Sequence, residues 1–333
     1  MRKRGIGVAC MQYPLGFTAY PNPSAAFVKI NEDGTATVLT GATDIGQGST
    51  TVLGQIAAEE LGINRDQISM VTSDTDRTPL DMGSIASRVT YVAGNAVRKA
   101  AADAKQILFE EASYELGVEA RALDSANGKI FLRDFPDRSV DFADMAVRCI
   151  LKKGKPPIGK GSHNPATTHL DEETGIGKPF EAYVYAAQVA RVEVDTETGE
   201  VEVLKIYAAH DCGNAINPRM VEGQIVGGVS MGVGYALMEE MVLKDGKVQN
   251  PQLRDYIIPT AKDMPEVETA IIQDPEPTGP FGAKGIGEPS LLPTAPAIIN
   301  AIYDAVGVRI KELPATSEKI LKGIRELEET KNR

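Results

Sequence analysis

The segment spanning residues 279–306 most constrains how this chain folds, because a glycine-rich loop there runs directly into an apolar helical pattern. Three glycines within residues 282–287 permit positive φ angles and let a ligand approach the main chain closely. Pro289 suits the first turn of the helix, which we expect to end at Val306. Glu288 lies between loop and helix, so it either complements the helix dipole or serves as a functional carboxylate.

A second glycine loop follows a predicted hairpin. The hairpin is centred on Asp33-Gly34, a strong signal for a tight turn between two strands. Residues 46–48, Gly-Gln-Gly, then lead into a helix expected over residues 49–61, with Ser49 or Thr50 as its cap. Free backbone N–H groups could bind a phosphate or a dithiolene-bearing ligand here, or the loop could be an ordinary glycine turn. It is neither a Walker A motif nor a dinucleotide-binding glycine motif.

A third loop, residues 78–88, precedes a long helix expected over residues 89–116. Ser84 and Ser87 lie near the start of this helix. They would either cap the helix or donate hydrogen bonds to a bound cofactor together with nearby backbone amides.

The second half of the chain reads as a sheet-based lobe. Residues 181–194 and 201–209 form the clearest long hairpin, and a glycine-rich helix follows over residues 220–240. We expect close helix packing at most of its glycines. We expect an α+β chain. A connection rich in Lys, Gly and Pro marks the boundary between one lobe at 1–160 and the other at 161–333.

Charge and cysteine content narrow the class of protein. A formal net charge of -11 argues against a nucleic-acid surface. The N-terminus resembles a short strand and not a signal peptide, and no apolar run is long enough for a transmembrane span. Cys10, Cys149 and Cys212 are too few and too widely spaced for a disulfide framework or for an iron–sulfur cluster of the chain's own. A cytoplasmic setting is therefore expected.

Histidine and cysteine positions do not predict a metal site. His163 and His169 lack zinc-like spacing, and we expect both at the surface. His210, Asp211 and Cys212 are consecutive, but neighbouring side chains on a strand point to opposite faces. Cys212 is therefore predicted to be a buried structural cysteine.

Five segments in a fixed order resemble the molybdenum hydroxylase family, which contains xanthine dehydrogenase, aldehyde oxidoreductases, nicotinate dehydrogenase and aerobic carbon monoxide dehydrogenase. In chain order they are residues 3–8, 41–48, 83–97, 211–224 and 284–289. The resemblance implies two mixed α/β lobes that form the C-terminal half of a molybdopterin-binding subunit. It is strongest to the medium molybdopterin subunit of nicotinate dehydrogenase.

This resemblance also implies cofactors and partners. A large molybdopterin subunit would supply the preceding half of the site, and 2Fe-2S and FAD subunits would pass electrons to NAD(P). The implied cofactor is a molybdopterin dinucleotide, expected to contain cytosine, whose molybdenum carries a terminal sulfido or selenido ligand. The pterin would hold the metal, so no side chain of this chain is expected to bind it. No nucleic-acid or membrane partner is expected.

In the family pattern, Glu288 matches the active-site glutamate, which takes the proton from a molybdenum-bound hydroxide as that oxygen attacks an electron-poor carbon. Ile286 and Gly287 flank this glutamate at the metal. Gln47 matches a glutamine that hydrogen-bonds a molybdenum ligand or the pterin. The residues that match its neighbours and the segment around the pterin and dinucleotide are Gly46, Gly48, Ser84, Ile85, Ala86 and Ser87.

Arg88 departs from the family, where a small apolar residue is often found. We expect it either to pair with a cofactor phosphate or to contact the half of the site that this chain lacks.

The implied activity is hydroxylation of an N-heteroaromatic substrate such as nicotinate, giving 6-hydroxynicotinate with oxygen derived from water. Two alternatives remain open at this point. The same fold could act on an aldehyde, a purine or an aromatic thioester, or the chain could be a non-catalytic subunit that carries cofactor or assists assembly.

Overall fold

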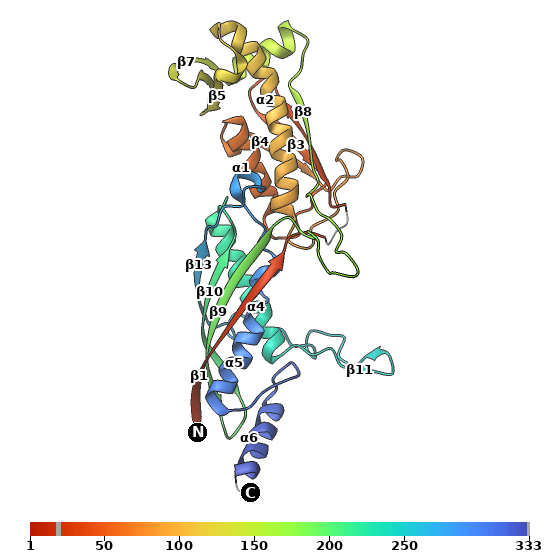
Figure 1. Ribbon diagram of the computed structural model, residues 1–333, viewed down its shortest axis with the longest axis vertical. Helices are drawn as coiled ribbons and strands as arrows, with labels where there is room; N and C mark the ends of the chain where they lie inside the picture. The colour runs from red at the N-terminus through yellow and green to blue at the C-terminus, as the bar shows by residue number, and fades with distance from the viewer. Residues whose placement is uncertain (18–20, 332–333) are drawn as a thin grey trace.

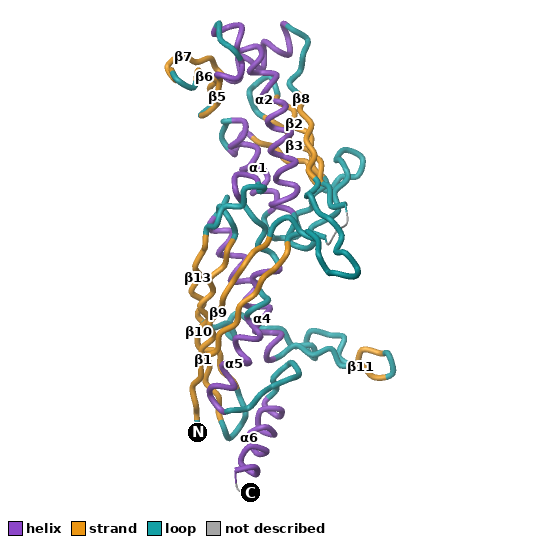
Figure 2. Tube along the Cα trace, in the orientation of Figure 1, coloured by secondary structure: helices purple, strands orange, loops and turns teal. Residues whose placement is uncertain are grey.

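The computed structural model describes residues 1–17 and 21–331 and shows an elongated molecule with two groups of helices and strands along its long axis (Figure 1). Both groups mix helix with sheet, which confirms the predicted α+β class with two mixed lobes. The two four-stranded sheets, one in each group, lie one above the other along this axis (Figure 2). Among the helices in the described ranges, none has the length and apolar character needed to span a bilayer.

The first lobe is built on a four-stranded sheet of order β4-β3-β2-β8. Its strands are β2 (Ser24–Ile30), β3 (Ala36–Thr40), β4 (Ile68–Thr72) and β8 (Ile158–His163). Strands β2 and β3 pair antiparallel across the Asp33-Gly34 turn, which confirms the predicted hairpin. The β3–β4 pair is parallel.

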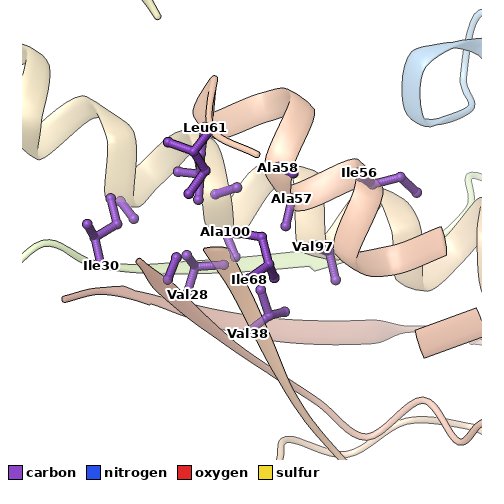
Figure 3. Close-up of a cluster of buried hydrophobic side chains, with 14 of the residues drawn as sticks. Val28, Ile30, Val38, Ile56, Ala57, Ala58, Leu61, Ile68, Val97 and Ala100 are labelled. Atoms are coloured by element: carbon purple, nitrogen blue, oxygen red, sulfur yellow. The ribbon is translucent and has the colours of Figure 1, made fainter. Parts of the chain in front are cut away.

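Two helices cover one face of this sheet, α1 (Ser49–Leu61) and α2 (Gly94–Leu116), the latter preceded by the π-helical turn η2 (Val89–Ala93). Alternate residues of the central strands point toward the helices, so Val28 and Val38 meet Ile56 and Leu61 in the core (Figure 3). All four side chains are fully buried, and each such burial stabilises the fold by about 1.5–3 kcal/mol.

A small extension follows α2. Its elements are η3 (Ala120–Ala122), β5 (Leu123–Ala126), β6 (Lys129–Leu132), β7 (Phe135–Asp141), α3 (Phe142–Val147) and η4 (Arg148–Lys152), whereas the short turn η1 (Arg65–Gln67) connects α1 to β4. Strands β5, β6 and β7 form a separate sheet, in which the Asn127-Gly128 turn joins β5 to β6. The Asp141 carboxylate caps α3 by accepting hydrogen bonds from two of its backbone amides.

The second lobe contains a sheet of order β1-β9-β10-β13. Its strands are β1 (Arg2–Pro14), β9 (Tyr183–Asp195), β10 (Val201–Asp211) and β13 (Glu266–Ile272). Strand β1 pairs with β9 along its whole length, although the two are far apart in sequence. The N-terminal strand therefore belongs to the sheet of the second lobe. The boundary between residues 160 and 161 stays a prediction from the sequence, and it does not separate the strands of one sheet from those of the other.

Three helices and two short turns complete this lobe: α4 (Pro218–Leu237), η5 (Pro280–Gly282), η6 (Glu288–Ser290), α5 (Thr294–Val306) and α6 (Ser317–Lys331). The prediction that a helix begins at Pro289 is wrong, because residues 288–290 form a separate 3₁₀ turn and α5 begins at Thr294. Pro293 has no N–H to bond the carbonyl of residue 289, and its ring would clash there. The helix therefore starts anew after Pro293.

The glycines of α4 pack as predicted only in part. A Cβ on Gly228 would lie 2.0 Å from Ser290 Oγ, and one on Gly232 would lie 2.3 Å from Thr294 Cβ, so these two glycines allow close packing. A Cβ on Gly234 would lie 2.0 Å from Glu239 Oε1, whereas one on Gly223 or Gly227 would have no atom within 4 Å, so these last two glycines are the exceptions.

An arm projects from the body between α4 and β13 and carries the hairpin of β11 (Leu243–Lys244) and β12 (Lys247–Val248) (Figure 1). We define the arm as residues 238–262. Several of its large apolar side chains are exposed, among them Leu243 and Leu253.

Candidate functional site

A cavity of about 300 Å³ lies where the two lobes meet. The first lobe contributes wall residues from 45–52 and 84–90, and the second contributes wall residues from 212–224 and 283–288. The wall thus joins the Gly-Gln-Gly loop, the serine loop before η2, the start of α4 and the glutamate loop, which are distant in sequence.

Most of the residues singled out from the sequence line this cavity: Gln47, Ser84, Ile85, Ser87, Ile286, Gly287 and Glu288. Gly46, Gly48 and Ala86 belong to the same loops but are not among the lining residues. The fold therefore brings the predicted residues to one place, whatever each of them does there.

The glutamate and the serine loop contact each other directly. Ser87 Oγ donates a hydrogen bond to Glu288 Oε2, and the Glu288 backbone N–H donates to Ser87 Oγ at 3.0 Å. Neither Ser84 nor Ser87 caps a helix, since Ser84 Oγ donates to the carbonyl of Thr43 instead. The hydroxyl of Ser87 thus fixes the orientation of the Glu288 carboxylate.

The main chain around Ser87 is unusual and tightly enclosed. Ala86 and Ser87 both have φ near 50°, a left-handed conformation that is costly for residues with a side chain. The carbonyl of Ala86 accepts a hydrogen bond from the amide of Gly16 at 2.9 Å. A Cβ on Gly285 would lie only 1.8 Å from the Ser87 carbonyl oxygen, so the glutamate loop can pass here only as glycine.

Tyr13, near the end of β1, lies close to the Glu288 carboxylate although it is not among the residues that line the cavity, and sequence reasoning missed it. Burial raises the pKa of the Tyr13 hydroxyl, and the nearby charge of Glu288 raises it further. No local signal marked Tyr13, because only the pairing of β1 with β9 brings it to the glutamate.

The guanidinium of Arg88 is bound within its own chain. Its side chain is fully buried, and its guanidinium pairs with Asp81 Oδ1 at 2.6 Å. It also donates to Asn22 Oδ1 at 2.5 Å, to Ser24 Oγ at 2.6 Å and to the carbonyl of Pro23 at 2.9 Å. Arg88 is therefore saturated by its own chain and holds the serine loop against the first sheet.

The Gly-Gln-Gly loop also differs from expectation. Asp44 accepts hydrogen bonds from the amides of Gly46, Gly48 and Thr50 at 2.9, 3.2 and 3.0 Å. Burial alone would raise the pKa of Asp44, but these amide bonds outweigh it, so the pKa lies below its ordinary value. The prediction that Ser49 or Thr50 caps α1 is wrong, and three of the amides that could have faced an anion donate to this carboxylate instead.

Gln47 is held within its own loop. Its Nε2 donates to Thr43 O at 3.2 Å and to Ser49 Oγ at 3.1 Å, while Oε1 accepts from the amide of Ile45 at 2.7 Å. The side chain lines the cavity in a fixed orientation.

Cys212 is buried as predicted, and burial raises the pKa of its thiol to about 11.

The two histidines expected at the surface differ in their exposure. His169 is exposed, but the surface prediction for His163 is wrong, because its ring is half-buried and lies edge-on to Tyr91. Burial, and then the charge of Lys99, lower the pKa of His163. Within residues 1–17 and 21–331, no three His, Cys, Asp or Glu side chains are grouped so that they could hold a metal ion.

Comparison with known proteins gives a consistent picture. The family model of the molybdopterin cofactor-binding domain matches residues 1–265. The chain is 36% identical over 327 residues to the putative xanthine dehydrogenase molybdenum-binding subunit XdhA of Escherichia coli, covering 96% of this chain and 42% of that protein. It is 33% identical over 317 residues to the nicotine 6-hydroxylase large subunit of Paenarthrobacter nicotinovorans, covering 91% and 37%.

A solved structure agrees with these relatives. Quinoline 2-oxidoreductase from Pseudomonas putida 86 superposes with a TM-score of 0.87 and 26% identity, covering 98% of this chain and 42% of that one. The chain thus spans less than half the length of the relatives it matches.

Proposed function

Since this chain belongs to the molybdenum hydroxylase family as a molybdopterin-binding subunit, we propose that it forms part of the active site of a multi-subunit hydroxylase. The proposed reaction adds oxygen from water to an electron-poor carbon of an N-heteroaromatic acid such as nicotinate, giving 6-hydroxynicotinate. The observation that carries the proposal is the Ser87–Glu288 pair on the wall of the cavity between the lobes.

The cavity wall suits a pterin. It offers the amide side chain of Gln224 and the remaining acceptor positions on the side-chain oxygens of Gln47, Ser84, Asn214 and Asn217, which can hydrogen-bond the N–H groups of such a ring. When bound, molybdopterin would supply the two-electron oxidation and the oxygen transfer. The dinucleotide form with cytosine, and a terminal sulfido or selenido ligand on molybdenum, belong to this proposal.

Glu288 is the proposed general base. Its carboxylate is half-buried, faces the cavity, and would accept the proton released as the new carbon–oxygen bond forms. Ser87 donates to Oε2, so the other carboxylate oxygen, Oε1, is the proposed proton acceptor. Tyr13 lies beside the same carboxylate and would help to exclude water and fix its orientation.

Partner subunits are part of the proposal. The relatives contain more than twice the length that this chain matches, so a large molybdopterin subunit would supply the remainder of the site, with 2Fe-2S and FAD subunits passing electrons to NAD(P). Exposed apolar side chains on the arm, residues 238–262, support a partner that covers them. Free thiols at Cys10, Cys149 and Cys212 support a reducing, cytoplasmic setting.

The names of the relatives bear on the substrate. Nicotine 6-hydroxylase and quinoline 2-oxidoreductase are named for N-heteroaromatic compounds, which supports the nicotinate class. A purine is the second candidate, because the E. coli relative is named as a xanthine dehydrogenase subunit. The position of Glu288 on the cavity wall favours a catalytic subunit over one that only carries cofactor or assists assembly.

The decisive experiment is purification of the assembled complex from its native source, with molybdenum and pterin analysis and assays against nicotinate, xanthine and an aldehyde. We expect molybdenum to copurify and nicotinate to be hydroxylated. Glu288→Gln should retain molybdenum and pterin while turnover falls by about 10²- to 10⁴-fold, as loss of a general base does. The exposed Glu318→Gln is the control. Turnover of xanthine but not of nicotinate would show that the substrate is a purine. Full activity of Glu288→Gln would refute the proposed role of Glu288 as general base.

A further inference from the structure

A buried amide lies directly beneath the turn that carries Glu288. Gln188 on β9 is fully buried, and its Nε2 donates to the carbonyl of Ser290 at 3.0 Å. Its Oε1 accepts a hydrogen bond from Thr294 Oγ1, the first residue of α5, at 2.6 Å. One side chain of the sheet thus binds both η6, which begins at Glu288, and the helix that follows it.

His210 on β10 completes this contact. Its Nε2 lies 2.9 Å from Gln188 Nε2, and since that amide nitrogen is a donor, the imidazole nitrogen accepts. His210 is fully buried, and burial lowers its pKa to about 4, which keeps the ring neutral at physiological pH. The neutral ring therefore remains an acceptor for Gln188 throughout the working range.

The other end of the glutamate loop is tied to the next residue of the same strand. Lys284 Nζ pairs with Asp211 Oδ2 at 2.7 Å, and both side chains are almost entirely buried. The amide of Lys284 also donates to the carbonyl of Cys212 at 2.9 Å. His210 and Asp211 are consecutive on β10, where neighbouring side chains point to opposite faces. His210, through Gln188, holds the Ser290 end of the loop 284–290, and Asp211 holds its Lys284 end.

We propose that Gln188 is a positioning residue for Glu288: by fixing the Ser290 end of the loop against His210, it sets where the Glu288 carboxylate points in the cavity. This inference rests on the proposed function, in which Glu288 accepts a proton. Within the turn, Ser290 Oγ donates to the Gly287 carbonyl at 2.7 Å, so a displaced Ser290 would carry the Glu288 backbone with it. A shift of about 1 Å at a reacting group can lower a rate by about 100-fold.

The test is a double-mutant cycle in the assembled complex. Gln188→Leu should lower kcat by about 10- to 100-fold with molybdenum and pterin content unchanged. In the Glu288→Gln background the same substitution should lower kcat by less than about twofold, because the residue it positions is already gone. A purely structural loss would instead multiply with the loss from Glu288→Gln.

Asn95→Leu is the matched control. Asn95 is also a buried amide, but it donates to the carbonyls of Tyr91 and Thr278 and not to the glutamate turn. Any effect of Asn95→Leu should be the same in both backgrounds. If Gln188→Leu does not fold, Thr294→Val removes only the donor to Gln188 Oε1 and should show the same non-additivity on a smaller scale.

Hydrogen exchange gives a readout independent of activity. In the full-length chain, Gln188→Leu should speed exchange of the amides of Ser290, Leu291 and Thr294, which close the turn and the start of α5, while amides of the first sheet stay unchanged. The positioning role is overturned if turnover is unaffected, if the loss persists in full in the double variant, or if these amides exchange as in the wild type. Full activity of Glu288→Gln alone would overturn the proposed function instead.

Discussion

Ser87 and Glu288, 201 positions apart in the sequence, exchange hydrogen bonds in both directions: the serine hydroxyl donates to the carboxylate and accepts from the glutamate amide. One residue belongs to the loop before η2 in the first lobe, and the other to the loop before α5 in the second. The orientation of the carboxylate therefore depends on how the two lobes meet.

Ser87→Ala should lower turnover of the assembled complex by about 10- to 100-fold, because a hydrogen bond to a charged group is typically worth about 1.5–3 kcal/mol. Steady-state kinetics with cofactor content measured alongside would check this. Ser113→Ala is the control, since that hydroxyl only donates to Glu110 O on an exposed face of α2. Wild-type kcat in Ser87→Ala would show that the serine does not orient the base.

Gly285→Ala should destabilise the full-length chain by about 1–3 kcal/mol or more, because the new Cβ would lie 1.8 Å from the Ser87 carbonyl oxygen, which is backbone and cannot move aside cheaply. Gly223→Ala is the matched control on α4. Nothing lies near a Cβ there, so this change should stabilise the helix by about 0.5–1 kcal/mol. Urea unfolding of both variants tests the contrast, and equal effects would contradict the packing of the two loops.

Asp44→Asn should cost about 1 kcal/mol of stability at neutral pH, because the carboxylate accepts three amide hydrogen bonds at the start of α1. The folded pKa of Asp44 is depressed, so its contribution is fully present above the unfolded value of about 3.9 and is lost as pH falls through the lower folded value. The difference between wild type and variant should therefore shrink below about pH 4. Urea midpoints from pH 7 to pH 3 measure this, with the exposed Asp137→Asn as control; a difference that grows on acidification would contradict it.

Alkylation should distinguish the three thiols. At neutral pH iodoacetamide should label only Cys10 in the folded chain, since Cys10 is exposed while Cys149 and Cys212 are buried with raised pKa values. All three should react in urea, and Cys10→Ser should leave the folded chain unlabelled. Peptide mass analysis reads the sites directly, and modification of Cys212 in the folded chain would show that the cavity opens.

Local chemistry in the sequence was enough to predict the elements that depend on it. The Asp33-Gly34 turn dictates its own hairpin, and the glycine loop places Glu288 between loop and helical turn. The start of α5 differs from the prediction because Pro293 lacks an N–H and its ring blocks the turn before it, so the helix cannot run through from Pro289. The resemblance to a family added the expectation that distant loops share one site, which spacing alone does not provide.

Tertiary contacts explain what the sequence did not reveal. Tyr13 reaches Glu288 only because β1 pairs with β9, a partner more than 150 positions away. Asp44 takes three amides that could have faced a ligand, and Arg88 is paired with Asp81 inside its own lobe. Each is a competition among polar groups for the same partners, and its outcome depends on where the backbone places them.

The arm at residues 238–262 has a consequence for how such a protein must be produced. It carries equal numbers of cationic and anionic side chains, in a chain whose formal charge is -11, and exposes Leu243 and Leu253 at 62% and 72%. Without charge repulsion, these apolar side chains favour self-association of any copy that lacks a partner. Surplus copies would therefore be lost to aggregation, and the yield of the protein would depend on balanced synthesis of this polypeptide and the proposed partner that covers the arm.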